Sequence, residues 1–217
     1  MSISTYTELK TALARWSHRA DLAEDLDEVI DLAEAWLNSK LRLIEMEQTS
    51  TVSASTTSRY LGYPDDMLEM MTLNLEKDEY YAEVRYLTKD QLRRIATTSS
   101  AEPEYYTVRG DLEFNCVPTE AYTVEMHYIK KLGLSDAEPT NDVLTEYPNI
   151  YLFACRAQIA DLVRDYKEEE KQTVKALDAI KAAEGRSKRK RGIRKQRMQS
   201  ELTIFNRNYY NIETGAY

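Results

Sequence analysis

Two amphipathic helices are predicted near the N-terminus. Thr5 followed by Glu8 has the spacing of a capping box, in which side chains satisfy the free amide groups of the first helical turn. Asp25 followed by Glu28 has the same spacing, and the short link between the helices predicts an antiparallel pair. Apolar residues recur at helical spacing at Leu9, Leu13, Trp16 and Ala20, and then at Leu26, Val29, Ile30, Ala33, Leu37, Leu41 and Ile44.

Alternation with a period of two replaces the helical pattern between Tyr60 and Ile129, after a Thr- and Ser-rich segment at 49–58 that is interpreted as extended or loop. Such alternation predicts half-buried antiparallel strands. Gly110-Asp111 predicts a hairpin turn, and the pair Thr88 and Gln91 predicts a short helix up to Ala96. The alternating apolar positions are Val84 and Tyr86, then Leu112, Phe114 and Cys116, and then Tyr122, Val124, Met126 and Tyr128.

Helical periodicity returns after a proline-containing loop at 135–148. Residues 152–163 are apolar over a wide arc, which predicts a helix at the centre of a bundle. A further helix is predicted from about Lys167, with an apolar stripe that ends at Ala183. Beyond that point only Ile193 and Met198 are apolar before Leu202.

These patterns predict an α+β fold that is mainly α: an antiparallel helical bundle with an inserted small antiparallel β-region and an extended C-terminal arm. The predicted body covers residues 1–185, with helices at about 5–46 and 143–185 around a β-region at about 49–132. Residues 186–199 form a basic segment, as a helix extension or a hinge. Residues 200–217 form the C-terminal arm.

Charge is distributed unevenly along the chain. The net charge is −8, from 29 basic and 37 acidic residues. Removing the eight basic residues of the basic segment leaves 21 basic against 37 acidic, a net of −16 for the rest. This segment is predicted to face an acidic partner surface or DNA, with a solvated helix face as the alternative. Its candidate residues are Arg186, Lys188, Arg189, Lys190, Arg191, Arg194, Lys195 and Arg197.

Tyrosine is unusually frequent, with sixteen residues against three phenylalanines. A tyrosine side chain combines an apolar ring with a polar tip, which suits surfaces that become buried on assembly. Half-buried positions in an ordinary domain explain the same excess, and both interpretations remain open. The C-terminal arm is predicted to order on a partner. Its candidate anchors are Leu202, Ile204, Phe205, Tyr209, Tyr210 and Ile212.

Catalytic and metal-binding patterns are absent from the sequence. The glycines form no phosphate-binding loop, and His18 and His127 stand alone. Cys116 and Cys155 are expected to be reduced and packed. Asp65-Asp66 after Pro64 fits a turn or a helix cap better than an ion site. We therefore expect no enzyme activity, no cofactor and no metal, and the longest apolar run, residues 150–155, predicts no membrane span.

Short motifs occur in a defined order. In the N-terminal helices these are Tyr6, Leu9, Trp16 and Asp21, then Val29-Ile30, Leu32-Ala33-Glu34, Leu37-Asn38 and Leu41-Arg42. The middle of the chain has Leu61, Pro64, Asp66, Leu68, Pro103, Tyr105-Tyr106, Gly110, Pro118, Tyr122-Thr123-Val124, Tyr128 and Leu132-Gly133-Leu134. Asn141, Leu144, Pro148 and Tyr151 precede the central helix. Over about residues 5–184 this order resembles the head-to-tail adaptor, or connector, family of tailed bacteriophages, with a departure at Glu120, where the family has a second proline.

The resemblance implies a four-helix body with an inserted β-region, assembled into a homo-oligomeric ring of twelve copies. It implies a virion structural protein at the head-tail junction, present in the host cytoplasm during assembly. Its implied partners are the portal protein, a downstream tail or nozzle protein, and the duplex DNA that passes through the channel during packaging and ejection, but no membrane. On this basis the C-terminal arm is expected to bind the portal.

Two other functions are open on the sequence alone. A nucleic-acid-binding regulator would use residues 186–197 as a basic arm, although the acidic remainder of the chain repels nucleic acid. A small enzyme with a carboxylate site is the second, and it lacks a recognisable catalytic constellation.

Overall fold

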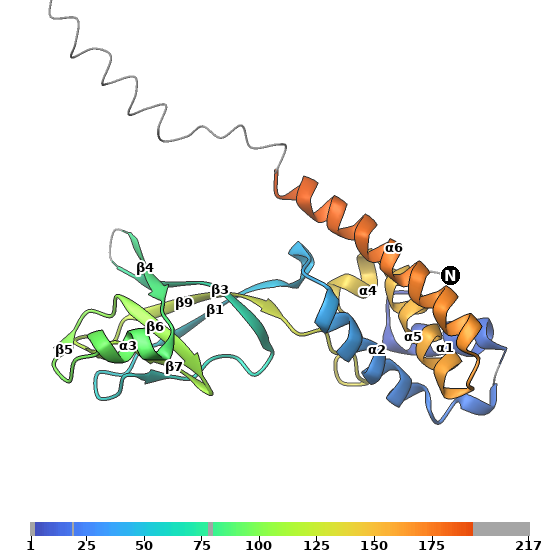
Figure 1. Ribbon diagram of the computed structural model, residues 1–217, viewed down its shortest axis with the longest axis horizontal. Coiled ribbons are helices and arrows are strands. Elements are labelled where there is room, and N and C mark those ends of the chain that lie inside the picture. The colour runs from blue at the N-terminus through green and yellow to red at the C-terminus, as the bar shows by residue number, and fades with distance from the viewer. Residues whose placement is uncertain (1–2, 19, 78–79, 193–217) are drawn as a thin grey trace, which may run out of the picture.

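The computed structural model describes residues 3–18, 20–77 and 80–192. The chain has two lobes joined end to end: a helical lobe built from both ends of this range, and a lobe built around a sheet (Figure 1). The helical lobe contains α1 (Tyr6–Ser17), a 3-10 turn (Ala20–Leu22), α2 (Leu26–Lys40), a second 3-10 turn (Ile44–Met46), α4 (Asp142–Glu146), α5 (Pro148–Leu162) and α6 (Tyr166–Lys190).

The two N-terminal helices begin differently. At Thr5 the predicted capping box is confirmed, with the hydroxyl accepting from the Glu8 amide and the Glu8 carboxylate accepting from the Thr5 amide. The box predicted at Asp25 is wrong, because Asp25 already has helical backbone angles and its side chain makes no capping hydrogen bond. α2 also ends at Lys40, earlier than predicted. The chain then becomes extended at Leu41 and places both Leu41 and Leu43 in the core.

The sheet has seven strands in the order β1-β9-β3-β4-β6-β7-β2, so β1 and β2 form its edges. β3 is the longest strand and pairs with β9, the last strand before the chain returns to the helices. A separate two-stranded pairing joins β5 to β8. The strands are β1 (Glu47–Ser53), β2 (Tyr60–Leu61), β3 (Met67–Glu76), β4 (Tyr81–Tyr86), β5 (Ser100–Ala101), β6 (Tyr105–Arg109), β7 (Asp111–Phe114), β8 (Val117–Pro118) and β9 (Thr123–Lys130).

The predicted fold class is wrong. Instead of a helical bundle with a small antiparallel β-region, the described residues form six helices and a curled, half-barrel sheet, with 45% of residues helical and 24% in strands. The sheet is also mixed rather than antiparallel, because β4 and β6 pair in parallel. The parallel pairing arises because α3 (Lys89–Ile95) lies in the connection between β4 and β6, which allows β6 to run in the same direction as β4.

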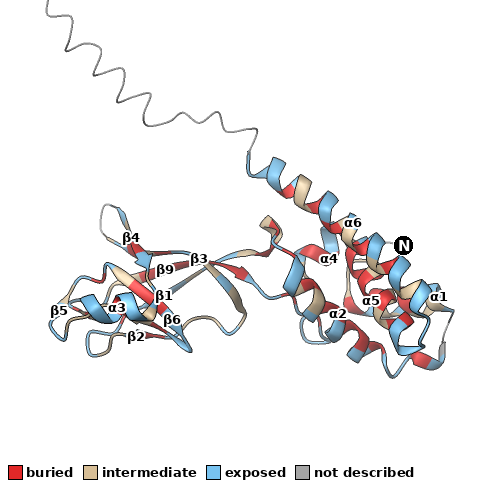
Figure 2. Cartoon of the chain, viewed as in Figure 1, coloured by how far each residue is buried: buried red, intermediate tan, exposed pale blue. Residues whose placement is uncertain are grey.

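Each lobe has its own hydrophobic core (Figure 2). The helical core surrounds α5, whose buried side chains include Tyr151 and Cys155, both fully buried. The sheet core includes Leu73, Leu75 and Phe114. Ile129 at the end of β9 already belongs to the helical core, so this strand carries the chain from one core to the other.

Candidate docking surfaces

Two side chains of α2 hold the chain that leaves β9. The Asn38 carboxamide accepts from the Leu132 amide at 2.8 Å and donates to the Leu132 carbonyl at 3.1 Å. One turn earlier on the helix, Glu34 accepts from the Leu134 amide at 3.2 Å. Together these bonds fix the connection between the sheet lobe and the helical lobe against α2.

Glu34 is also part of a buried polar network. The Tyr151 hydroxyl donates to Glu34 Oε1 at 3.0 Å and accepts from Asn141 Nδ2 at 2.7 Å. The Asn141 Oδ1 atom in turn caps α4 through the Leu144 amide at 2.7 Å. Burial raises the pKa of Glu34 to about 7, and the nearby charge of Asp31 adds to the rise. The hydrogen bonds donated by Tyr151 and Leu134 oppose it.

The C-terminal end of α6 is bound to the 3-10 turn Ile44–Met46 and to the first residue of β1. The Ile44 amide donates to Ser187 Oγ at 2.9 Å, and Lys190 Nζ lies 2.7 Å from Glu45 Oε1. Arg191 forms an ion pair with Glu47, the first residue of β1. Burial acts to raise the pKa of Glu45. The hydrogen bond and the charge of Lys190 outweigh this effect, so that the pKa of Glu45 lies below its ordinary value.

The structure therefore divides the predicted basic residues. Lys190 and Arg191 are engaged with glutamates of the same chain, and the Arg186 guanidinium lies 6.0 Å from the centroid of the Tyr147 ring. Lys188 and Arg189 are exposed and make no ion pair within the described residues. Arg194, Lys195 and Arg197 lie outside the described residues, as do all six predicted arm anchors: Leu202, Ile204, Phe205, Tyr209, Tyr210 and Ile212. That the basic segment and the C-terminal arm bind a partner stays a prediction.

A cleft of about 210 Å³ lies beside this junction between the lobes. Acidic side chains line much of it, together with two lysines at the end of β9. The Glu45 Oε2 atom is buried and has no hydrogen-bond partner among the described residues. The charged lining residues are Glu45, Glu47, Glu138, Asp142, Lys130 and Lys131.

Tyrosines occupy two different environments. Five are buried and belong to the two cores: Tyr6, Tyr106, Tyr128, Tyr147 and Tyr151. Five are more than half exposed: Tyr60, Tyr80, Tyr81 and Tyr86 on the sheet lobe, and Tyr166 on the helical lobe. The buried group fits positions in an ordinary folded domain, whereas burial of the exposed group on assembly stays a prediction. The exposed group on the sheet lobe offers amphipathic contact area for a partner.

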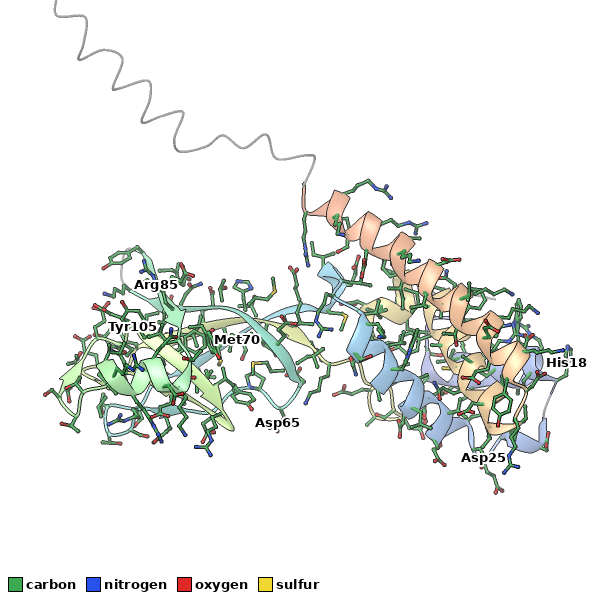
Figure 3. The ribbon with its side chains drawn as sticks, viewed as in Figure 1. His18, Asp25, Asp65, Met70, Arg85 and Tyr105 are labelled. Carbon is green, nitrogen blue, oxygen red and sulfur yellow. The ribbon has the colours of Figure 1, made fainter. Side chains whose placement is uncertain are left out.

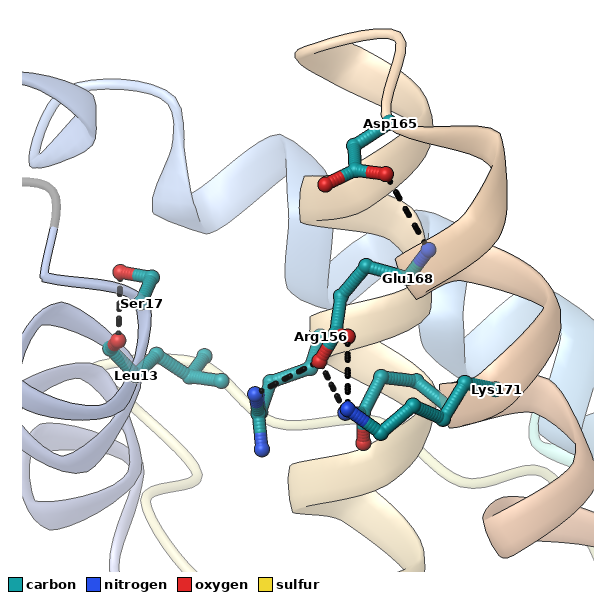
Figure 4. Close-up of polar contacts among 7 residues, drawn as sticks. Leu13, Ser17, Arg156, Asp165, Glu168 and Lys171 are labelled. Carbon is teal, nitrogen blue, oxygen red and sulfur yellow. Dashed lines mark hydrogen bonds and ion pairs between the residues drawn. The ribbon is translucent and has the colours of Figure 1, made fainter.

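The end of the helical lobe that lies away from the sheet carries His18 and Asp25 (Figure 3). There α6 is fastened to α5 by Arg156, which lies 3.1 Å from Glu168 (Figure 4). Lys171 lies 3.0 Å from the same carboxylate, and Asp165 caps the helix by accepting from the Glu168 amide at 3.2 Å. These contacts fasten the start of α6 to α5 beside the exposed apolar side chains of Trp16 and Val163.

Residues that could have carried chemistry have structural contacts instead. Asp66 accepts a hydrogen bond from the Tyr128 hydroxyl at 3.1 Å and lies 3.6 Å from Lys130 Nζ. Cys116 and Cys155 are buried free thiols, and burial raises the pKa of both. Within the described residues, no group of three or more His, Cys, Asp or Glu side chains is placed to hold a metal ion. No described helix is long and apolar enough to cross a membrane.

Sequence reasoning missed the polar network around Glu34. A signal was present, because Glu34 follows Ile30 by four positions and precedes Leu37 by three, on the apolar side of α2. A carboxylate in such a stripe indicates a buried partner. The partner itself, Tyr151, is 117 positions away and could not be identified from the pattern.

One family model matches the chain. It is described as SU10 adaptor protein, and it covers residues 4–203. No curated protein matches. The matched range includes both lobes, all of α6 and the basic segment.

Proposed function

Because the chain belongs to the SU10 adaptor protein family, a family of phage adaptors, we propose that it joins the portal to the tail. In this proposal it is a non-enzymatic virion component. Twelve copies form a ring that docks beneath the portal, extends the DNA channel and receives a downstream tail or nozzle protein. The family match over residues 4–203 is the observation that carries the proposal.

The two-lobed shape supports this role. An adaptor must contact different proteins above and below as well as its own copies, and an elongated subunit presents separate surfaces for each. The net charge of −8 fits a channel through which DNA slides. Proteins bind DNA mainly through basic side chains that neutralise its phosphates, and an acidic protein holds DNA less tightly. The exposed tyrosines of the sheet lobe fit a contact with another protein.

The C-terminal arm is the segment that we propose binds the portal. It follows the basic segment, whose first part is held by ion pairs at the junction of the lobes. Its eighteen residues span up to about 60 Å when fully extended, at about 3.3 Å per residue, which is enough to reach another subunit. Aromatic and branched anchors supply most of the energy of an interface when they enter pockets.

The test combines the purified protein with the portal of the same phage and examines the mixture by electron microscopy. We expect a ring beneath the portal, and a chain truncated after Gln199 should remain folded without joining it. A second variant replaces the six anchors by serine in the full-length chain, and it should also fold without joining the portal. Wild-type protein that neither forms a ring nor binds the portal would refute the proposal, whereas a truncated chain that joins normally would refute only the role of the arm.

A further inference from the structure

The helical lobe has two exposed helix faces of opposite charge. The first is on α2 and the residues just before it. No Lys or Arg occurs at positions 20–39, which contain seven carboxylates. Asp27 pairs with Lys10, and Glu34 is buried. Four others are exposed and make no ion pair within the described residues: Glu24, Asp25, Glu28 and Asp31.

The second face is on α6. At about 100° per residue, the side chains opposite the buried stripe of Gln172, Ala176 and Ile180 form one solvent-facing strip. Up to Lys181 the exposed charges of this strip are mostly basic, and its two acids, Glu170 and Asp178, are outnumbered two to one. Lys171 also pairs with Glu168, and Lys181 with Asp178. The basic residues are Lys167, Lys171, Lys175 and Lys181.

Both faces also have the steric pattern of a helix contact. Leu32 is 52% exposed in the acidic face, and Val174 is 52% exposed in the basic one. Small residues lie on the same faces, Ala35 and Ser39 on α2, and Ala182 and Gly185 two to three turns beyond Val174 on α6. Nothing lies within 4 Å of the position that a Cβ atom at Gly185 would occupy. A helix face that combines exposed apolar and small side chains allows a second helix to approach closely.

The acidic face also contains a hollow of about 110 Å³ that is large enough for part of a side chain. It lies between α2 and α5 and is lined by Leu32 and Leu162, with three carboxylates around them: Asp25, Glu28 and Asp161. An apolar floor with carboxylates at the rim matches a lysine side chain, which buries its methylene stem and keeps its ammonium at the surface.

The two faces point in different directions. α2 and α6 both pack on α5, and Figure 1 shows α5 between them. The α5 residues beside α2 are Gln158, Asp161 and Leu162. Those beside α1 and the start of α6 are Arg156, Ile159, Ala160 and Val163. At about 100° per residue these two groups lie on nearly opposite sides of α5.

From this arrangement we infer that the basic face of α6 in one copy packs against the acidic face of α2 in the next copy. The contact is heterologous, since it joins two different patches, and a heterologous contact repeated with constant rotation closes into a ring. The inference rests on the proposed ring and names the surfaces that build it. The occupant of each face is thus a second copy of this chain.

Charge reversal tests the contact in the full-length protein, with and without portal. Lys175→Glu with Lys181→Glu should raise the concentration at which rings form by at least about tenfold. Glu28→Lys with Asp31→Lys should do the same, because each double variant places like charges across the interface. Combining all four substitutions in one chain should restore assembly. Arg93→Glu with Arg94→Glu, on the exposed side of α3, is the matched control and should assemble normally.

Cross-linking gives a second readout of the same contact. A mixture of Leu32→Cys and Val174→Cys proteins should form a disulfide-linked dimer, whereas each variant alone, and Leu32→Cys mixed with Met71→Cys, should not. Rings that form normally in both reversal variants, without this cross-link, would overturn the inference and leave the proposed function standing. Wild-type protein that never assembles, even with portal, would overturn both.

Discussion

The hydroxyl of Tyr151 donates a hydrogen bond to the carboxylate of Glu34 across 3.0 Å, inside the core of the helical lobe. Tyr151 is fully buried and Glu34 is 6% exposed. Burial raises the pKa of Glu34 to about 7, above its ordinary value of 4.5. The folded state therefore binds a proton at this site over a pH range in which the unfolded chain has released it.

The pH dependence of stability follows from this difference. A raised pKa contributes stability that is fully present below about pH 4.5 and is lost as the pH rises through about 7. Replacing Glu34 by Gln removes the titration. The free energy of unfolding of the wild type, measured relative to that of Glu34→Gln, should therefore fall by about 2–3 kcal/mol between pH 4.5 and 8.

Urea unfolding across this pH range measures the effect. Tyr151→Phe provides an internal check, because it removes the hydroxyl that donates to Glu34 and favours the ionised carboxylate. The pKa of Glu34 should then rise further, and the stability should be lost at a higher pH. A constant difference between wild type and Glu34→Gln at all pH values would show that folding does not raise the pKa of Glu34.

Asn38 should be important for stability although it lies at the edge of the core. Asn38→Ala leaves both backbone groups of Leu132 without their partner, which should cost about 1–3 kcal/mol in the free energy of unfolding. Ser39→Ala is the control, since Ser39 is exposed and, among the described residues, its hydroxyl bonds to the Trp36 carbonyl of the same helix. It should change stability by less than about 0.5 kcal/mol. Equal effects of the two substitutions would contradict the role of Asn38 in holding the connection between lobes.

Local signals in the sequence predicted several elements. The capping boxes at Thr5 and Thr88 are present, and Gly110 forms the β6–β7 turn with a φ of 75°. The return from two-residue to helical periodicity follows the end of β9, although the change at Tyr60 falls thirteen residues after the sheet lobe begins at Glu47. These features depend on neighbours in the sequence, so a pattern can reveal them.

The architecture of the sheet depends on contacts that no local pattern contains. The Thr- and Ser-rich residues 49–53 become part of the edge strand β1 because β9 provides a pairing partner at least 70 positions away. β3 lacks clean alternation because its register shifts near Met67 and again near Met70. Such irregularities move side chains between the faces and break the period of two. No local pattern predicts the parallel pairing of β4 with β6 either.

The candidate interaction residues were only partly accessible to sequence reasoning. The basic segment stood out by composition, but the sequence did not indicate that Lys190 and Arg191 pair with Glu45 and Glu47. These pairs join positions about 145 residues apart. The opposite orientation of the charged faces of α2 and α6 could not be predicted from the sequence, because it depends on the position of α5 between the two helices in the folded lobe.

Leu37 should be among the most sensitive core positions of α2. Its side chain is fully buried in the helical core, so Leu37→Ala should reduce the free energy of unfolding by about 2–5 kcal/mol through lost contacts and a cavity. Leu32→Ala, on the exposed face of the same helix, is the matched control and should cost far less. Denaturant unfolding of both variants measures the difference, and a Leu37→Ala protein as stable as the wild type would contradict the assigned core face.

The basic segment should separate into two classes when its association with the portal is measured across a salt series. Lys188 and Arg189 are exposed without ion pairs among the described residues, so Lys188→Gln with Arg189→Gln should weaken portal association and reduce its dependence on salt. Lys190→Gln with Arg191→Gln removes the same charge but breaks the ion pairs to Glu45 and Glu47. This second variant should mainly lower the free energy of unfolding, because Glu45 is left 7% exposed without its cation. Identical salt slopes for wild type and the first variant would show that these exposed charges do not face the portal.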